Sequence, residues 1–294
     1  MSASLLLQGV ILGVLLGGLY ALLAAGLTLY FGVMRVVMIA HSAFLILAAY
    51  IAWWMNSSLG LDPLLSLVVT VPTFFLVGYG MQRALLSRLR PATLTMMSVL
   101  LTFAIALTIE GALGFFFTGT QRRIQLPYSS SSIEVLGAQV AVVKLVAFGL
   151  AAVALVALWA VLKLTSFGQA LRATIQHPEA ARLLGINTDR IAGFGFGLGL
   201  ATAAIGGTAL SLDSTIYPSL HWHWIGPLMA IIVIGGLGSI PGAAIAAMLL
   251  GVSQALLQIP LGTTWAQTVF YVALFVTLMI RPQGFFGGRL AQRF

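Results

Sequence analysis

Long apolar segments separated by short polar ones make up most of this chain. A helix needs about 20 mostly apolar residues to cross the hydrocarbon core of a bilayer. The pattern therefore predicts an all-α membrane protein, a polytopic helical bundle of about 8 transmembrane helices. The expected spans are Leu5–Tyr30, Ile39–Met55, Pro63–Met81, Leu94–Thr118, Val140–Leu162, Ile191–Leu212, Ala243–Gln258 and Trp265–Ile280.

One further apolar stretch, between Trp224 and Pro241, is too short and too rich in glycine for a complete crossing. We predict a re-entrant half-helix there, followed by irregular backbone. Such backbone occurs at membrane depth only where it is buried in protein or lines a cavity. The alternative is one long, kinked helix over Ile225–Gln258.

Composition supports lipid as the main solvent of the chain. Hydrophobic residues make up 60% of the 294 positions and charged residues only 7%, whereas a soluble domain carries about 25% charged residues. The chain has no cysteine, which excludes disulfide and thiolate chemistry. The first segment has no positive n-region and no clear cleavage site, so we expect it to remain as a spanning helix. We expect residues 1–294 to form a single transmembrane domain.

The distribution of Lys and Arg predicts the orientation. Eleven of the 14 lie in one set of loops and three in the other, namely Arg122, Arg123 and Lys144. Because cytoplasmic loops are enriched in positive residues, the larger set is expected in the cytoplasm. The N-terminus is then outside and the C-terminus is cytoplasmic. The net charge of +8 is explained by these loops, so we predict no nucleic acid partner.

The polar loop at residues 163–190, on the predicted cytoplasmic side, contains a short helical segment. Pro178 suits the first turn of a helix, and Glu179 places a carboxylate beside the positive helix N-terminus. Gly185 permits a left-handed cap, and Asn187 or Thr188 can cap the next spanning helix. This short helix either lies on lipid headgroups or docks a cytoplasmic partner.

The same loop carries a family resemblance. Glu179-Ala180-Ala181 followed by Gly185 resembles the E-A-A-x-x-x-G motif of permease subunits of bacterial ATP-binding-cassette (ABC) importers. Several further segments resemble the permeases of the branched-chain amino acid (Leu/Ile/Val-type) importer family, and the resemblance extends from about Gly9 to Gly287. These segments are Tyr20–Leu22, Phe31–Val33, Phe167–Ala173, Leu184–Asn187, Asp189–Arg190, Gly235–Gly242 and Arg281–Gly287.

The resemblance implies a transport subunit that is not itself an enzyme. It implies a second, related permease subunit, two cytoplasmic ATPase subunits, an external (periplasmic) solute-binding protein, and a bacterial inner membrane as the location. This chain would hold no cofactor, since ATP and Mg would bind the ATPase, and it contains no phosphate-binding loop motif. The residues expected to couple it to the ATPase are Pro178, Glu179, Ala180, Ala181, Arg182 and Gly185.

One segment departs from the family. Where the family usually has Asn-Phe-Ala-His-Gly, this chain keeps only Ala40 and His41 within Met38–Ala43. Substrates other than branched-chain or hydrophobic amino acids therefore stay open, including urea, amides and organic acids. An ion-coupled secondary transporter is the alternative from another class. An intramembrane protease is disfavoured, because the chain has no G-x-S-x-G motif and no pair of membrane-embedded aspartates.

Ionisable groups at membrane depth are functional candidates. The residues expected along a translocation path are Arg35, His41, Ser42, Glu110, Gly235, Gly236, Gly238 and Ser239. The sequence His221-Trp222-His223-Trp224 contains two histidines without a nearby acid or cysteine, which makes a weak metal site. We predict no metal, and we interpret this motif as part of an aromatic belt at the outer interface or as a contact for an external protein.

Overall fold

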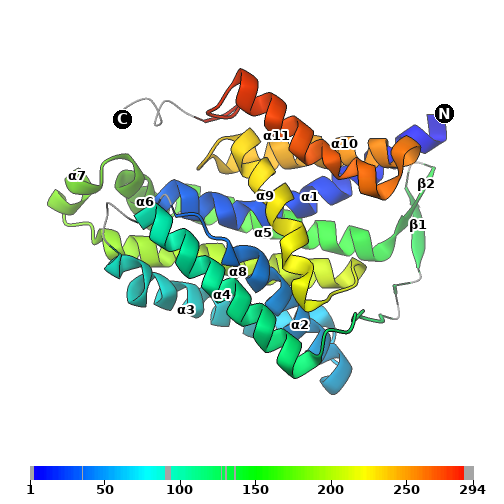
Figure 1. Ribbon diagram of the computed structural model, residues 1–294, viewed down its shortest axis with the longest axis horizontal. Coiled ribbons are helices and arrows are strands. Elements are labelled where there is room, and N and C mark those ends of the chain that lie inside the picture. Colours follow the sequence, from blue (N-terminus) through cyan, green and yellow to red (C-terminus); the bar gives the residue numbers. More distant parts are fainter. Residues whose placement is uncertain are drawn as a thin grey trace.

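The computed structural model of this chain describes residues 3–34, 36–89, 94–126, 128–129, 131–135 and 137–287. Most of its helices run roughly along one long axis (Figure 1). Its α-helices are α1 (Ala3–Met34), α2 (Ala40–Leu59), α3 (Leu67–Ala84), α4 (Leu94–Phe117), α5 (Val142–Leu164), α6 (Ser166–Gln176), α7 (Pro178–Leu183), α8 (Thr188–Asp213), α9 (His221–Gly235), α10 (Ile240–Ala266) and α11 (Thr268–Ile280). One hairpin pairs strand β1 (Ser132–Val135) with β2 (Ala138–Ala141).

The predicted spans are confirmed as helices. Within the described residues, seven helical segments are long and apolar enough to cross a membrane, and α11 is a shorter apolar helix of 13 residues. Each of the eight expected spans falls largely on a helix, so the chain is a multi-pass membrane protein. The seven segments are Ser4–Gly32, Ala40–Leu59, Pro63–Arg88, Leu94–Phe117, Val142–Leu164, Thr188–Asp213 and Ile240–Ala266.

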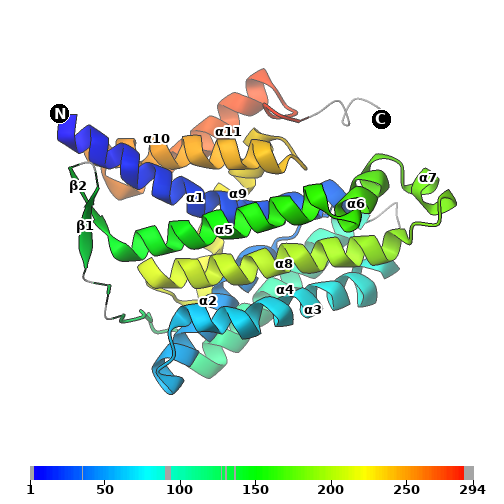
Figure 2. The same ribbon diagram turned by 180° about the vertical axis from the view of Figure 1, so that it is seen from behind.

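The most extensive helix contact among the described residues joins α1 to α10, which lie side by side in Figure 2. A Cβ built on Gly13 would lie 2.5 Å from Cα of Val252, and one on Gly17 would lie 2.8 Å from Cα of Met248. Only glycine therefore lets the two backbones approach this closely. In lipid such contacts matter because van der Waals packing drives helix association. The four-residue glycine spacing in α1 thus forms a helix-packing surface.

The segment between α8 and α10 follows a route that the sequence did not reveal. Asp213, at the end of α8, pairs with Lys144 at the start of α5. Gly238, just before α10, lies against Gly32 near the end of α1. These two contacts are at opposite ends of the bundle, so the segment with α9 joins the ends and does not return to the side it came from. The half-helix is confirmed, but a strictly re-entrant path is wrong, and so is the alternative of one long helix.

The two ends of the bundle differ in structure. The end with the chain's N-terminus carries the β-hairpin, whereas α6 and α7 lie at the opposite end (Figures 1 and 2). At the hairpin end, Arg122 and Ile216 exchange two backbone hydrogen bonds of 2.8 Å. The Arg122 guanidinium also lies 4.9 Å from the ring centroid of Trp53. These contacts tie the long loop after α4 to the connection between α8 and α9 and to α2.

Candidate functional site

The polar loop at residues 163–190 folds as two helices, α6 and α7. The Thr165 hydroxyl accepts from the Gly168 backbone N–H over 3.2 Å and caps the N-terminus of α6. A Cβ on Gly168 would lie 2.0 Å from the Leu162 carbonyl oxygen, so α6 can pack against the end of α5 only through glycine. Leu171 is buried on the inner face of α6. The loop is therefore attached firmly to the bundle on its α6 side.

Helix α7 is short and protrudes from this attachment. Pro178 begins it and Glu179 lies in its first turn, as predicted. Gly185 has φ +81°, and the Ile186 N–H donates to the Ala181 carbonyl over 3.0 Å, which closes a left-handed cap. Leu183 and Leu184, just before this glycine, are 90% and 81% exposed. Two leucines this exposed at the end of a bundle form an apolar surface that no described residue of the chain covers.

Arg182 connects α7 to the start of α8. Its Nε donates to Oγ1 of Thr188 over 2.8 Å, and its Nη2 lies 3.8 Å from the Asp189 carboxylate. Thr188 is buried at the first turn of α8, whose N-cap is Asn187, one of the two residues predicted for this role. Arg182 thus connects α7 directly to a spanning helix.

The two alanines predicted to couple this chain to the ATPase, Ala180 and Ala181, do not share one exposed surface. Ala180 is exposed, but Ala181 is only 2% exposed because it packs inside the chain. The surface open to a partner is therefore formed by Pro178, Glu179, Ala180 and the two leucines, while Ala181 fixes how α7 sits on the bundle.

The glycine turn between α9 and α10 is held by backbone contacts. Gly236 and Gly238 have φ of +94° and +85°, which favour glycine. A Cβ on Gly236 would lie 2.2 Å from the Gly287 nitrogen, and one on Gly235 would lie 2.5 Å from the Ala243 nitrogen. Ser239 caps α10 by accepting from the Gly242 N–H over 3.2 Å. Gly235 and Gly236 are buried in protein, whereas Gly238 and Ser239 line a cavity at this end of the bundle.

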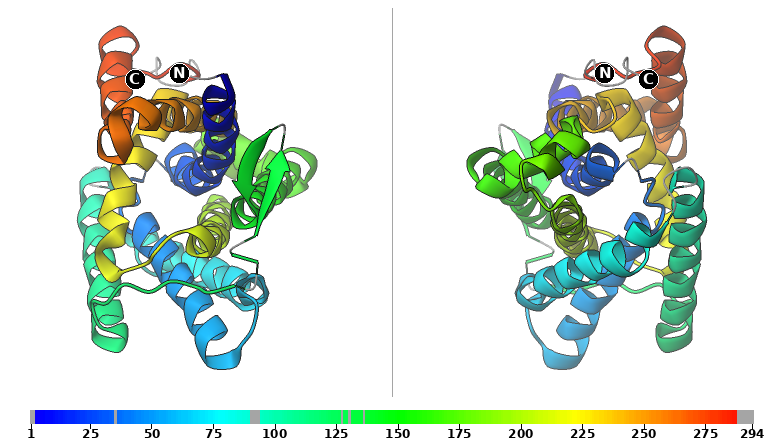
Figure 3. Two further views of the ribbon diagram at one scale, coloured as in Figure 1. Left: turned by 90° about the vertical axis from the view of Figure 1, so that its right-hand side faces the viewer. Right: turned by 90° about the vertical axis from the view of Figure 1, so that its left-hand side faces the viewer.

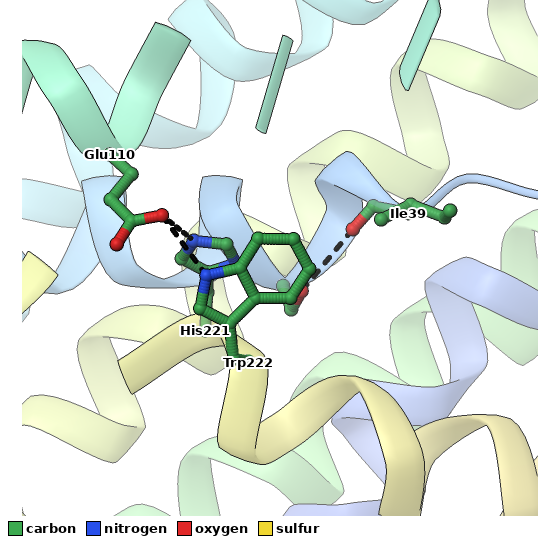
Figure 4. Close-up of polar contacts among 5 residues, drawn as sticks. Ile39, Glu110, His221 and Trp222 are labelled. Carbon is green, nitrogen blue, oxygen red and sulfur yellow. Dashed lines mark hydrogen bonds and ion pairs between the residues drawn. The ribbon is translucent and has the colours of Figure 1, made fainter. Parts of the chain in front are cut away.

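Glu110 is the one carboxylate of the sequence that lies more than a turn from both ends of a spanning helix. Its Oε2 accepts from Nε1 of Trp222 over 3.0 Å and lies 3.0 Å from Nε2 of His221 (Figure 4). The His221 side chain is 1% exposed and the Glu110 side chain is 25% exposed. Both partners belong to the first turn of α9, so the carboxylate joins α4 to the beginning of the half-helix.

The surface around Glu110 lies between α4 and α11. Viewed along the bundle in Figure 3, α9 runs along one side of the molecule between these two helices. Trp222 is 38% exposed there and its ring lies 5.7 Å from that of Phe103. A partly exposed carboxylate at membrane depth is costly in lipid. This side of α4 and α9 is therefore expected to face water or another protein surface, and not lipid.

The segment before α2 is also attached to α4. Oγ1 of Thr102 accepts from the Ile39 N–H and donates to the Val37 carbonyl, both over 3.2 Å. Thr102 and Glu110 are eight residues apart, so they project from similar faces of α4. Sequence analysis missed Thr102, because a buried threonine in a spanning helix gives no local signal.

His41 and Ser42 do not reach a cavity. His41 is fully buried, with Nε2 2.9 Å from the Leu23 carbonyl oxygen and Nδ1 3.4 Å from the Tyr30 hydroxyl. Ser42 is 2% exposed and donates to the Ile39 carbonyl. In this conformation His41 holds α1 and α2 together, Ser42 bonds to the backbone just before α2, and neither side chain lines a path. Arg35, the remaining candidate near them, lies outside the described residues.

The histidine and tryptophan motif at residues 221–224 divides between two surroundings. Trp222 and His223 are exposed, whereas His221 and Trp224 are buried at 1% and 9% exposure. Half of the motif therefore belongs to the protein interior and not to an interfacial belt. The described part of the chain contains no group of three or more metal-ligating side chains.

Comparison with known proteins agrees with this architecture. The chain matches the family described as "Branched-chain amino acid transport system / permease component" over residues 9–279. It is 29% identical to the high-affinity branched-chain amino acid transport system permease protein LivH of Salmonella typhimurium and to that of Escherichia coli, and it is 26% identical to BraD of Pseudomonas aeruginosa. Each alignment covers 96% of this chain and 95% of the relative.

No solved structure matches the chain. The family match covers nearly all of the sequence, from the glycine surface of α1 to the end of α11. The relatives align over almost their whole length, so the resemblance is not confined to one motif. The chain belongs to the family of permease components of branched-chain amino acid transport systems.

Proposed function

We propose that this chain is the permease subunit of an ATP-driven importer that carries branched-chain amino acids across a bacterial inner membrane. Residues 1–294 act as one transmembrane permease domain and form half of the translocation path. A second, related permease subunit forms the other half, and an external binding protein delivers the solute. The family membership and the named substrates of the relatives support this assignment.

The observation that carries the mechanism is the link between α7 and α8. Two cytoplasmic ATPase subunits hold ATP and Mg, and one of them docks on the exposed leucines at residues 183–184 and on Glu179 and Ala180 of this chain. Closure of the ATPase moves α7. Arg182 passes this movement to Thr188 and hence to α8. This arrangement explains why a chain without a phosphate-binding loop needs a short, protruding helix.

The path itself runs along the surface that carries Glu110. The carboxylate lies on the partly exposed side of α4 and α9, where the second permease subunit would enclose it. Glu110 gives this surface a polar group at membrane depth, which a zwitterionic or polar solute can approach. The glycine turn at Gly235–Ser239 positions α9 from its other end and borders the path at the α7 side.

Reconstitution tests the proposal directly. The chain is co-purified with its ATPase and second permease subunits, placed in vesicles with the binding protein, and assayed for ATP-dependent uptake of leucine, isoleucine and valine. We expect uptake that requires ATP hydrolysis. Uptake driven by an ion gradient without the ATPase would overturn the importer, and uptake of urea, amides or organic acids alone would overturn the substrate.

A reporter fused after Phe294 tests the orientation. The loop charges predict a cytoplasmic C-terminus and an external N-terminus. A fluorescent protein at this position should therefore fluoresce, and alkaline phosphatase should stay inactive. Active phosphatase would contradict the predicted orientation.

A further inference from the structure

A cavity of about 840 Å³ lies at the end of the bundle that carries α6 and α7. Its walls come from the ends of α1 and α5, from α6, and from the turn between α9 and α10. The transport mechanism above uses the glycine turn in one wall of this cavity but assigns no role to its α5 and α6 side. Its lining is largely apolar at one side and cationic at another, and it includes Trp159, Lys163, Arg172, Leu237 and Ile240.

Two cations face this cavity without an acidic partner. Lys163 and Arg172 both line it, and none of its lining residues is Asp or Glu. Among the described residues no carboxylate forms an ion pair with either side chain. Lys163 Nζ lies 5.2 Å from the centroid of the Trp159 ring, and Nη1 of Arg172 donates to the Leu162 carbonyl. The remaining N–H groups of both cations are available to an anion.

The apolar part of the lining continues toward the outside of the bundle. Trp159 is 51% exposed and Leu237 is 46% exposed, and Ile240 lies in the wall between α5 and α10. Lys163 belongs to the last turn of α5, where a spanning helix reaches the headgroup region. Tryptophan also favours this depth. The cavity therefore offers cations at headgroup level and an apolar wall where acyl chains begin.

We propose that this cavity binds an anionic phospholipid. The phosphate lies between Lys163 and Arg172, and an acyl chain runs along Trp159 and Leu237. Basic pockets between spanning helices recognise anionic headgroups in this way. A phosphatidylcholine or phosphatidylethanolamine headgroup fits less well, because its own cation would lie beside the two protein cations.

The position of the site gives the lipid a structural consequence. Arg172 belongs to α6, and α6 leads directly into α7. A lipid bound between α5 and α6 therefore holds the base of α7 in place. This inference does not depend on which solute the importer carries, because lipid binding is measured without transport.

The test uses the purified full-length chain in nanodiscs of phosphatidylcholine with increasing phosphatidylglycerol, followed by native mass spectrometry of retained lipid. Lys163→Gln removes one cation, whose only described side-chain contact is with an exposed ring, so the fold should persist. A cation near a membrane surface contributes about fivefold in binding. We expect Lys163→Gln to lower phosphatidylglycerol retention about fivefold and the double variant with Arg172→Gln to lower it further.

The matched control is the double variant Arg83→Gln and Arg88→Gln, which removes two cations that do not line this cavity. It should retain phosphatidylglycerol as the unchanged chain does. An equal loss of phosphatidylglycerol retention in both double variants would show that general surface charge causes the effect, and this would overturn the site. Equal retention of phosphatidylcholine, or displacement of the lipid by millimolar inorganic phosphate, would also overturn it.

Discussion

Oε2 of Glu110 lies 3.0 Å from Nε2 of the buried His221, and this contact fastens α4 to the first turn of α9. The two residues are 111 positions apart, and the same oxygen also accepts from Trp222. Helix α4 is otherwise mostly exposed, with few buried side chains. The carboxylate therefore contributes both to the attachment of α4 and to the polarity of the proposed path.

Removing the Glu110 carboxylate should separate these two contributions. Glu110→Ala leaves buried His221 without an acceptor, which costs about 1–3 kcal/mol. Glu110→Gln keeps an oxygen acceptor, so it should lower stability less while still reducing uptake. The measurements are thermal unfolding of the purified chain and leucine uptake in vesicles.

Thr108→Ala serves as the control for this pair, because Thr108 is exposed on the same helix and bonds only to its own backbone turn. If Glu110→Ala unfolds at the same temperature as this control, the contact with His221 does not stabilise the protein. Normal uptake by Glu110→Gln would show that transport does not require the carboxylate in the path.

Gly236 should be intolerant of any side chain. Even Gly236→Ala places a Cβ against the Gly287 backbone, at a φ of +94°. We expect Gly236→Leu to insert normally, because spans form from apolar helices, but to lose most uptake. Gly80→Ala is the matched control, since a Cβ there meets nothing within 4 Å, and it should be neutral or slightly stabilising. Wild-type uptake by Gly236→Leu would contradict the packing argument.

The exposed end of α7 should bind the ATPase. Leu184→Asp changes a side chain that is 81% exposed, so it should abolish ATPase capture in a pull-down while leaving unfolding unchanged. A helix that merely rests on lipid would show no such loss of capture.

The two positions that shape α7 should behave differently. Ala181→Trp cannot be accommodated at a site that is 2% exposed, so it should displace α7 and uncouple hydrolysis from uptake. Gly185→Val should lower the free energy of unfolding by about 1–2 kcal/mol. The left-handed backbone is the sole cause, because a Cβ there meets nothing within 4 Å. Gly185→Asn, which tolerates this conformation, should restore coupling. Substrate-stimulated ATP hydrolysis is the measurement, and normal coupling in Ala181→Trp would contradict the role of α7.

Tyr128 provides a pH-dependent contact in the loop after α4. Burial, and then the Asp62 carboxylate that accepts its hydrogen bond over 3.2 Å, raise the pKa of Tyr128 from 10.0 to about 12. The folded pKa is the higher one, so this contact stabilises the fold fully below pH 10 and is lost as the pH rises through 12. Absorbance at 295 nm should show one titration near pH 12 that disappears in Tyr128→Phe. A difference spectrum that titrates at pH 10 would exclude the bond to Asp62.

Most of the architecture followed from apolar segment lengths, because a spanning helix satisfies its own backbone and needs only a hydrophobic surface. The caps at Gly185 and Asn187 were also open to prediction, because residues close in the sequence form them. The Glu110–His221 contact was not, because nothing local joins positions 110 and 221. A lone acid in a spanning helix predicts that a partner exists, but does not identify it. The burial of Ala181 likewise depends on packing that no local pattern specifies.

The contact between α1 and α10 also has a consequence for biosynthesis. Gly13 meets Val252, so about 240 residues of chain must be made after Gly13 before its neighbour exists. At 5–20 residues per second this takes roughly 10 to 50 s. During that time the bare glycine surface of α1 is open to any other helix in the membrane. A nascent chain stalled before α10 should therefore be the form most readily captured by quality-control proteases, and the speed of translation becomes part of how this fold is reached.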